Sequence, residues 1–243
     1  WTLFNTYNVF VIFDESHHCA GDETQNANAW GEQILTNIQG RARYTMALTG
    51  TPWRSDTIPI ALANYLGEDS RLQVDYRYDL TQAIEDGVCR TPHMTLFDSE
   101  LINVIENDDK SSFTSISDFL LKSGLSYSEI ISHNEVIRRI LKHGIVQLNR
   151  ERQIFPDAGG LVVSASVNHA KQVQLLLTEL GESSDIVTYQ EDDPESLIRR
   201  FKGSRQKWII SVGMISEGTN IPRLRVCCYL SLVTTELYFR QVL

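Results

Sequence analysis

Two acidic residues and a histidine directly follow an apolar run near the start of the chain. Residues Val9 to Phe13 lead into Asp14, Glu15 and His17. This short β-branched and aromatic run predicts a strand buried on both faces, and ligands of parallel α/β sheets bind at the carboxyl ends of strands. There Asp14 could hold a cation through water while Glu15 takes a proton from an attacking water, as in metal-assisted hydrolysis. A solvated strand terminus is the alternative interpretation.

A second polar stretch follows the next predicted strand. Residues Tyr44 to Leu48 form a short apolar run that ends at Thr49, Gly50, Thr51 and Pro52. We expect the glycine to permit a tight turn and the two hydroxyls to hydrogen-bond to a neighbouring carboxylate or histidine. A plain Gly-Pro turn is the simpler alternative.

The same region contains His17, His18 and Cys19 in a row, which raises the question of a zinc site. Contiguous residues rarely converge on one metal, and no CxxC or HxxxH spacing supplies further ligands. The four cysteines show no disulfide framework. A metal cluster is therefore not expected here.

Four segments, in order along the chain, resemble motifs of one family. Asp14-Glu-Ser-His17 resembles the Walker B motif of the DEAD/DEAH (DExH)-box helicases of superfamily 2, and Leu48 to Arg54 resembles their third motif. Ser211 to Leu224 is similar to the fifth motif, and Tyr238 to Leu243 to the opening of the sixth. Within the family, the third and fifth motifs look most like those of DNA-repair helicases and restriction-enzyme motors.

For the first half of the chain, the resemblance implies an ATP site with magnesium. Asp14 would hold Mg²⁺ through water, and Glu15 would polarise the water that attacks the γ-phosphate of ATP. His17 would link this site to the opposing domain. Thr49 to Thr51, including Gly50, would couple hydrolysis to a nucleic-acid groove, with Arg54 a member of the same region.

For the second half, the resemblance places Ser164, Ser166 and His169 at the turn of the fourth motif. Members of the family often contact backbone phosphates there, and a helix N-terminus offers free N–H groups to anions.

The resemblance also places Glu217, Gly218, Asn220 and Gln241 near the nucleotide, with the glycine allowing a close backbone approach. The family usually carries an acid where this chain has Asn220. The contact expected there would be a neutral hydrogen bond, which is weaker than a charge-assisted one.

The implied fold is α/β, with two RecA-like parallel-sheet domains joined by a partly helical linker. We expect the incomplete first domain over residues 1–92, the linker or insertion over 93–133 and the second domain over 134–243. The helical stripe within 134–152 and the alternating strands and helices after it support the second domain.

Two family features are missing from the sequence. It contains no G-x-x-x-x-G-K-[ST] loop to cradle phosphates, and it lacks the Gly-Arg-x-x-Arg of the sixth motif. We therefore expect an internal piece of a longer helicase, with ATPase activity in the full-length protein and poor ATP binding by this piece alone. A scaffold module that does not hydrolyse ATP and a metallohydrolase built on Asp14, Glu15, His17 and His18 are the alternatives.

Composition sets limits on the partners. The chain has 243 residues, 42% of them hydrophobic and 22% charged, and contains no apolar run long enough for a membrane span. We expect a soluble protein of the cytoplasm or nucleoid. The net charge of −9 opposes a general attraction to nucleic acid, but a motor can confine its positive charge to one groove. Double-stranded DNA is the favoured partner, with possible fused or associated nuclease or recognition subunits.

Overall fold

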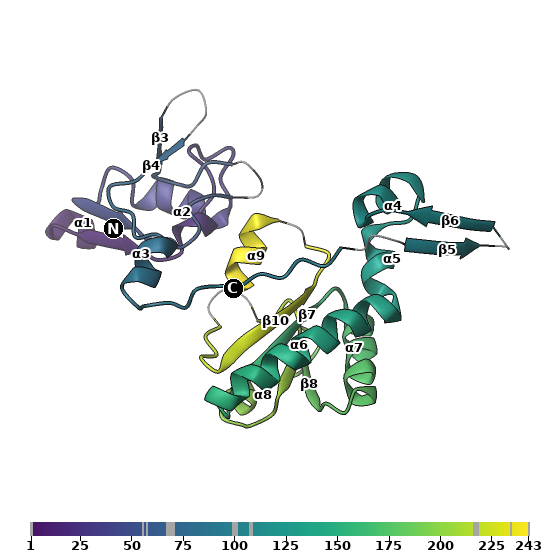
Figure 1. The fold of residues 1–243 in the computed structure, drawn as a ribbon. Coiled ribbons are helices and arrows are strands. Elements are labelled where there is room, and N and C mark those ends of the chain that lie inside the picture. Colours follow the sequence, from purple (N-terminus) through teal and green to yellow (C-terminus); the bar gives the residue numbers. More distant parts are fainter. Residues whose placement is uncertain are drawn as a thin grey trace. The chain divides into compact units, whose positions relative to one another are not determined.

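The computed structural model describes residues 2–54, 56, 58–66, 71–98, 102–106, 109–215, 219–233 and 235–242 (Figure 1). The chain divides into two compact units. The first comprises Trp1–Pro92 and Thr235–Arg240, and the second comprises His93–Thr234 and Gln241–Leu243. Within the described residues, no helix combines the length and apolar character needed to cross a membrane.

The first unit is built around a pair of parallel strands. Strand β1 (Phe10–Phe13) pairs in parallel with β2 (Tyr44–Ala47), and strands β3 (Asn64–Leu66) and β4 (Arg71–Gln73) form a separate antiparallel pair. The helical elements are α1 (Thr2–Thr6), the 3₁₀ turn η1 (Ser16–His18), α2 (Ala29–Asn37), α3 (Leu80–Glu85) and α9 (Glu236–Val242).

The expectation that β1 is buried on both faces was wrong. Phe10 is 52% exposed and Ile12 is 57% exposed, and their partners across the pair, Tyr44 and Met46, are exposed as well. Phe13 points to the opposite face, where it packs against the small core that includes Ile34. A two-stranded sheet with one packed face leaves alternate residues of each strand in solvent.

The second unit contains a four-stranded parallel sheet. Its strands are β7 (Gly159–Ser164), β8 (Ser184–Thr188), β9 (Trp208–Val212) and β10 (Leu224–Leu230), in the order β10-β7-β9-β8. The register aligns Gly160 with Trp208 and Ser164 with Leu230, so all four strands begin at one edge and end at the other. This confirms the parallel α/β architecture expected after residue 134.

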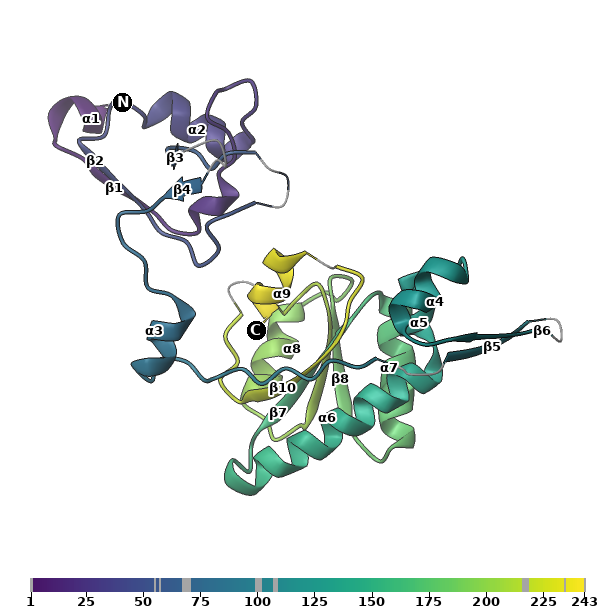
Figure 2. The same ribbon diagram turned by 45° about the horizontal axis from the view of Figure 1, so that its top comes forward.

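Helices cover both faces of this sheet (Figure 2). Helices α6 (Asn134–Ile154) and α7 (Val167–Glu179) share one core cluster with alternate strand residues such as Val162 and Ile210. Helix α8 (Pro194–Lys202) lies on the other face, where Phe201 is fully buried. Asp193 caps α8 by accepting a hydrogen bond from the N–H of Ser196, as the Asp-Pro pair predicts.

Residues 93–133 contain short elements. Strands β5 (Ile102–Glu106) and β6 (Asp109–Phe113) pair in antiparallel fashion, and helices α4 (Ile116–Lys122) and α5 (Tyr127–Ser132) follow them. Residues 76–79 and 91–98 have an extended backbone without strand pairing.

Two glycines make room for one indole in the second unit. A Cβ at Gly160 would lie 2.3 Å from the ring of Trp208. A Cβ at Gly144 of α6 would lie 3.2 Å from the same ring and 2.5 Å from the sulfur of Cys228. Helix and sheet therefore approach closely around Trp208, which is fully buried.

We predict that Gly160→Ala destabilises the protein by about 1–3 kcal/mol, because the new methyl group overlaps the Trp208 ring. Urea unfolding followed by circular dichroism measures this. Gly203→Ala is the matched control, since a Cβ there meets its nearest atom at 3.8 Å, and it should change stability by less than about 0.5 kcal/mol. Equal stabilities for both variants would contradict the packing argument.

Candidate functional site

The structure brings the two polar stretches of the first unit together. Strands β1 and β2 run in parallel, so Asp14 and Glu15 leave the sheet at the same edge as Thr49. The backbone N–H of Ser16 donates to the carbonyl of Leu48 at 3.0 Å, which joins the two connections just beyond the strands.

His17 lies at the centre of this cluster. Its side chain is buried, with Nδ1 2.8 Å from the hydroxyl of Thr49, 3.4 Å from that of Thr51 and 3.5 Å from a carboxylate oxygen of Glu15. Because the Thr49 hydroxyl accepts the N–H of Thr51 at 3.0 Å, it can donate its own hydrogen to Nδ1 of a neutral His17. Protonation would make Nδ1 a donor toward Glu15 instead. The hydrogen bond expected between a threonine hydroxyl and a histidine is therefore present.

Arg54 stabilises the same turn through a hydrogen bond to its backbone. Its guanidinium donates to the carbonyl of His17 and forms a two-point contact with Asp56. This hydrogen bond from Arg54 lowers the pKa of the Asp56 carboxyl. Burial raises the pKa of the nearby Cys19 thiol, and the charge of Arg54 acts against that rise.

The two carboxylates of the site are accessible. Asp14 is exposed and accepts a hydrogen bond from the N–H of Glu15, whose own side chain is 46% exposed. Glu15 adopts a left-handed backbone conformation with φ of 51°, which costs a residue other than glycine on the order of 1–3 kcal/mol. Such strain is typical of functional turns, and here it begins η1 immediately after the acids.

The backbone at Gly50 does not require a glycine, contrary to the expectation of a tight turn that only glycine permits. Its φ is outside the left-handed region, and open space surrounds the position of an added Cβ. The turn from Thr49 to Thr51 is held instead by the Thr49 hydroxyl.

Helix α2 holds η1 from the other side. The side chain of Asn28 accepts from the N–H groups of Gly31 and Ala20 and donates to the carbonyl of His18 at 2.7 Å. A Cβ at Gly31 would lie 1.8 Å from the carbonyl oxygen of Ala20, so only glycine permits this close approach.

In the second unit, buried polar residues gather where the strands end. Ser164 ends β7, and its hydroxyl is buried without a hydrogen-bond partner within the described residues. Ser166 caps α7 by accepting the N–H of His169, and Nδ1 of His169 accepts the N–H of Ala165 at 3.1 Å. The three predicted residues therefore lie together beside the start of α7.

Two further hydroxyls at this edge were not predicted. Ser211, near the end of β9, accepts the N–H groups of Met214 and Ile215, and Ser231, after β10, accepts that of Val233. A serine close to the ends of β7, β9 and β10 is the sequence signal that could have identified them. These bonds shape the connections that follow the strands.

The residues predicted to lie near the nucleotide are only partly described by the structure. Glu217 and Gly218 lie outside the described residues, as does the side chain of Gln241. Asn220 is exposed. No group of three or more His, Cys, Asp or Glu side chains gathers as a metal site in the part of the chain that the structure describes.

Arg223, from the segment similar to the fifth motif, lies at the opposite edge of the sheet. It is buried, donates to the carbonyls of Asp157, Phe201 and Gln206, and stacks over the Phe201 ring at 4.3 Å. Burial lowers its pKa. Its contacts are those of a structural clamp between β7, α8 and β10.

No protein-family model matches the chain. The chain is 30% identical over 240 residues to uncharacterized protein ML1624 of Mycobacterium leprae and to uncharacterized protein Rv2917 of Mycobacterium tuberculosis. Each match covers 96% of this chain and 39% of the relative. The chain therefore spans well under half the length of these curated relatives.

We predict that Arg223→Lys destabilises the protein by about 1–3 kcal/mol, because one ammonium group cannot reach three separate carbonyls and stack on a ring. Thermal and urea unfolding measure the loss. Arg205→Lys, at an exposed position, is the control and should be neutral. A neutral Arg223→Lys would show that the clamp contributes nothing.

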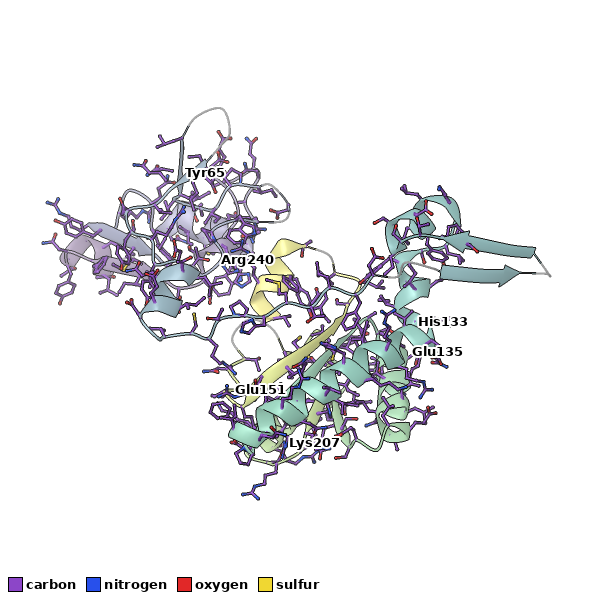
Figure 3. The ribbon with its side chains drawn as sticks, in the orientation of Figure 1. Tyr65, His133, Glu135, Glu151, Lys207 and Arg240 are labelled. Carbon is purple, nitrogen blue, oxygen red and sulfur yellow. The ribbon has the colours of Figure 1, made fainter. Side chains whose placement is uncertain are left out.

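We also predict a pH dependence from His169. Burial lowers its pKa, against an opposing contribution from the backbone of Ile131, so the unfolded chain binds the proton more readily than the folded protein. Stability should therefore fall as pH decreases below about 6.5, by at most about 1.4 kcal/mol per pH unit, and be retained above it. Urea midpoints between pH 7.5 and 5.5 should show a flatter profile for His169→Gln. His133→Gln, at an exposed position (Figure 3), is the matched control, and a slope change as large as that of His169→Gln would contradict the assignment to His169. A His169→Gln profile as steep as wild type would refute it as well.

Proposed function

We propose that this chain is part of an ATP-dependent helicase or translocase of nucleic acid, with double-stranded DNA as the favoured substrate. The observation that carries the proposal is the hydrogen-bonded cluster of Glu15, His17 and Thr49, formed where two parallel strands end. It joins the two segments that resemble the Walker B and third motifs.

The residues present suit magnesium and a nucleotide at this site. Asp14 offers an exposed carboxylate, the type of oxygen ligand through which Mg²⁺ and its waters are held. Bound Mg-ATP would supply the phosphoryl group that is transferred to water. Glu15, half-buried and next to His17, would accept the proton of that water.

His17 and Thr49 would carry the state of Glu15 to the threonine turn. The carboxylate and the hydroxyl both approach Nδ1 of His17, so a change in the proton or position of Glu15 alters the hydrogen bonding of Thr49. In this proposal His17 couples two segments of its own unit, in addition to the predicted link with the opposing domain.

The edge of the second unit would contact backbone phosphates. Ser164 contributes a buried hydroxyl whose hydrogen-bonding capacity is unused within the described residues. Ser166 and His169 lie at the start of α7, where the helix dipole favours anions.

A non-hydrolysing scaffold with the same fold is the second candidate. The exposed apolar face of β1 and β2, with Phe10 and Ile12, favours neither candidate, but the strained turn at Glu15 favours a motor. A scaffold would have no need of left-handed strain beside two acids.

We predict that the full-length protein hydrolyses ATP in the presence of duplex DNA and that Glu15→Gln lowers the turnover number by about 100-fold to 10,000-fold, because the water loses its proton acceptor. Phosphate release measures the rate. Glu85→Gln, in α3, is the matched control and should retain activity. The 243-residue chain alone should show negligible turnover. A full-length protein without ATPase activity would support the scaffold.

A further inference from the structure

The second unit has a second polar edge, where its four strands begin. The strand register places Gly159, Trp208 and Leu224 side by side there. Helices α6 and α8 both end at this edge, because each leads directly into a strand. It lies at the other end of the strands from Ser164 and His169.

Basic side chains dominate this edge. Residues 199–207 include five lysines and arginines and no acid, while Arg150 and Arg152 come from the end of α6 and Arg223 and Arg225 from the start of β10. The acids nearby are Glu151, Asp157, Glu182 and Asp185. The edge therefore carries an excess of positive charge, opposite in sign to the net charge of −9 of the chain.

Several of these charges have structural partners. Lys207 pairs with Glu182 at 3.0 Å, and Arg225 pairs with Glu151 at 3.6 Å. Glu151 and Lys207 mark this end of the second unit in Figure 3. Arg200 pairs with Asp185 at 3.6 Å. Arg199 pairs with Glu195 at 3.8 Å within α8. The remaining acid, Asp157, lines the same depression as Lys202 and Arg205, so one carboxylate faces two cations there.

Three exposed cations are left over. Within the part of the chain that the structure describes, Arg150, Lys202 and Arg205 form no ion pair. Lys202 and Arg205 line a depression of about 450 Å³, together with Pro156, Asp157, Gly203 and Ser204. The dipole of α8 favours a cation such as Lys202 in its last turn, but Arg205 lies beyond the helix.

We propose that the edge formed by Arg150, Lys202 and Arg205 is a second nucleic-acid surface that binds the phosphate backbone of a duplex. Arginine and lysine on one surface attract phosphates by releasing counterions. Apolar side chains also lie at this edge, since Ile154 is 72% exposed and Phe155 is 39% exposed. Binding to an anionic lipid surface is therefore the competing outcome that the test below separates from duplex binding. The inference rests on the proposed function only in its choice of nucleic acid as the polyanion.

The test is binding of the 243-residue chain to a fluorescently labelled 20-base-pair duplex without ATP, followed by anisotropy at several salt concentrations. The variant Arg150→Glu/Lys202→Glu/Arg205→Glu should raise Kd at least tenfold. It should also reduce the slope of log K against log salt by about 3, roughly one for each lost phosphate contact. Circular dichroism and melting temperature establish that the variant is folded.

The matched control is Arg41→Glu/Arg77→Glu/Arg90→Glu, which changes the net charge equally at exposed positions of the first unit. It should change Kd by less than about twofold at 150 mM salt. At this salt concentration the attraction between exposed charges more than about 8 Å apart is largely screened, so a change in net charge alone has little effect. Equal losses in the two variants, or wild-type binding by the edge variant, would overturn the proposal. The proposal would also be overturned if the edge variant lost binding to anionic phospholipid vesicles but still bound the duplex like the wild type. That result would assign the edge to a membrane surface. Because the assay contains no ATP, a failure of the proposed ATPase activity is scored separately.

Discussion

Parallel pairing of strands is the constraint on which both units depend. When neighbouring strands run in the same direction, every connection between them must cross from one edge of the sheet to the other. In the first unit this brings Glu15 and Thr49 out at one edge, and in the second it does the same for Ser164 and Ser211. Chemistry that needs side chains from distant segments can therefore be assembled from short, local turns.

The same constraint gives the second unit two edges of different character. The edge where strands end contains Ser164, Ser211 and His169, which are buried. Ser211 and His169 hydrogen-bond to the turns that follow the strands, whereas the Ser164 hydroxyl has no partner within the described residues. The edge where strands begin receives two helix C-termini and most of the local arginines. Buried Arg223 stabilises this second edge, while Lys202 and Arg205 remain in solvent. One sheet thus separates an edge where the exposed acids Glu191, Asp192 and Asp193 follow β8 from an edge that is rich in cations.

The sequence predicted best what depends on local patterns. The apolar stripe of Ile137, Leu141 and Leu148 is buried as expected, because helical periodicity is a property of neighbouring residues. The Asp193-Pro194 pair at the start of α8 is a local capping pattern of the same kind. Burial of β1 was predicted wrongly, because exposure of Phe10 depends on how many layers pack against the strand. The roles of Gly50 and Arg223 required knowledge of surrounding space and of partners as many as 66 residues away.

The packing around Trp208 also provides an optical label. The sequence contains four tryptophans, of which Trp208 alone belongs to the second unit, while Trp30 in the first is 71% exposed. Emission from a fully enclosed indole moves to longer wavelength when water reaches it. The colour of intrinsic fluorescence can therefore follow the opening of the α6–sheet core separately from events around α2, without any dye attached to the protein.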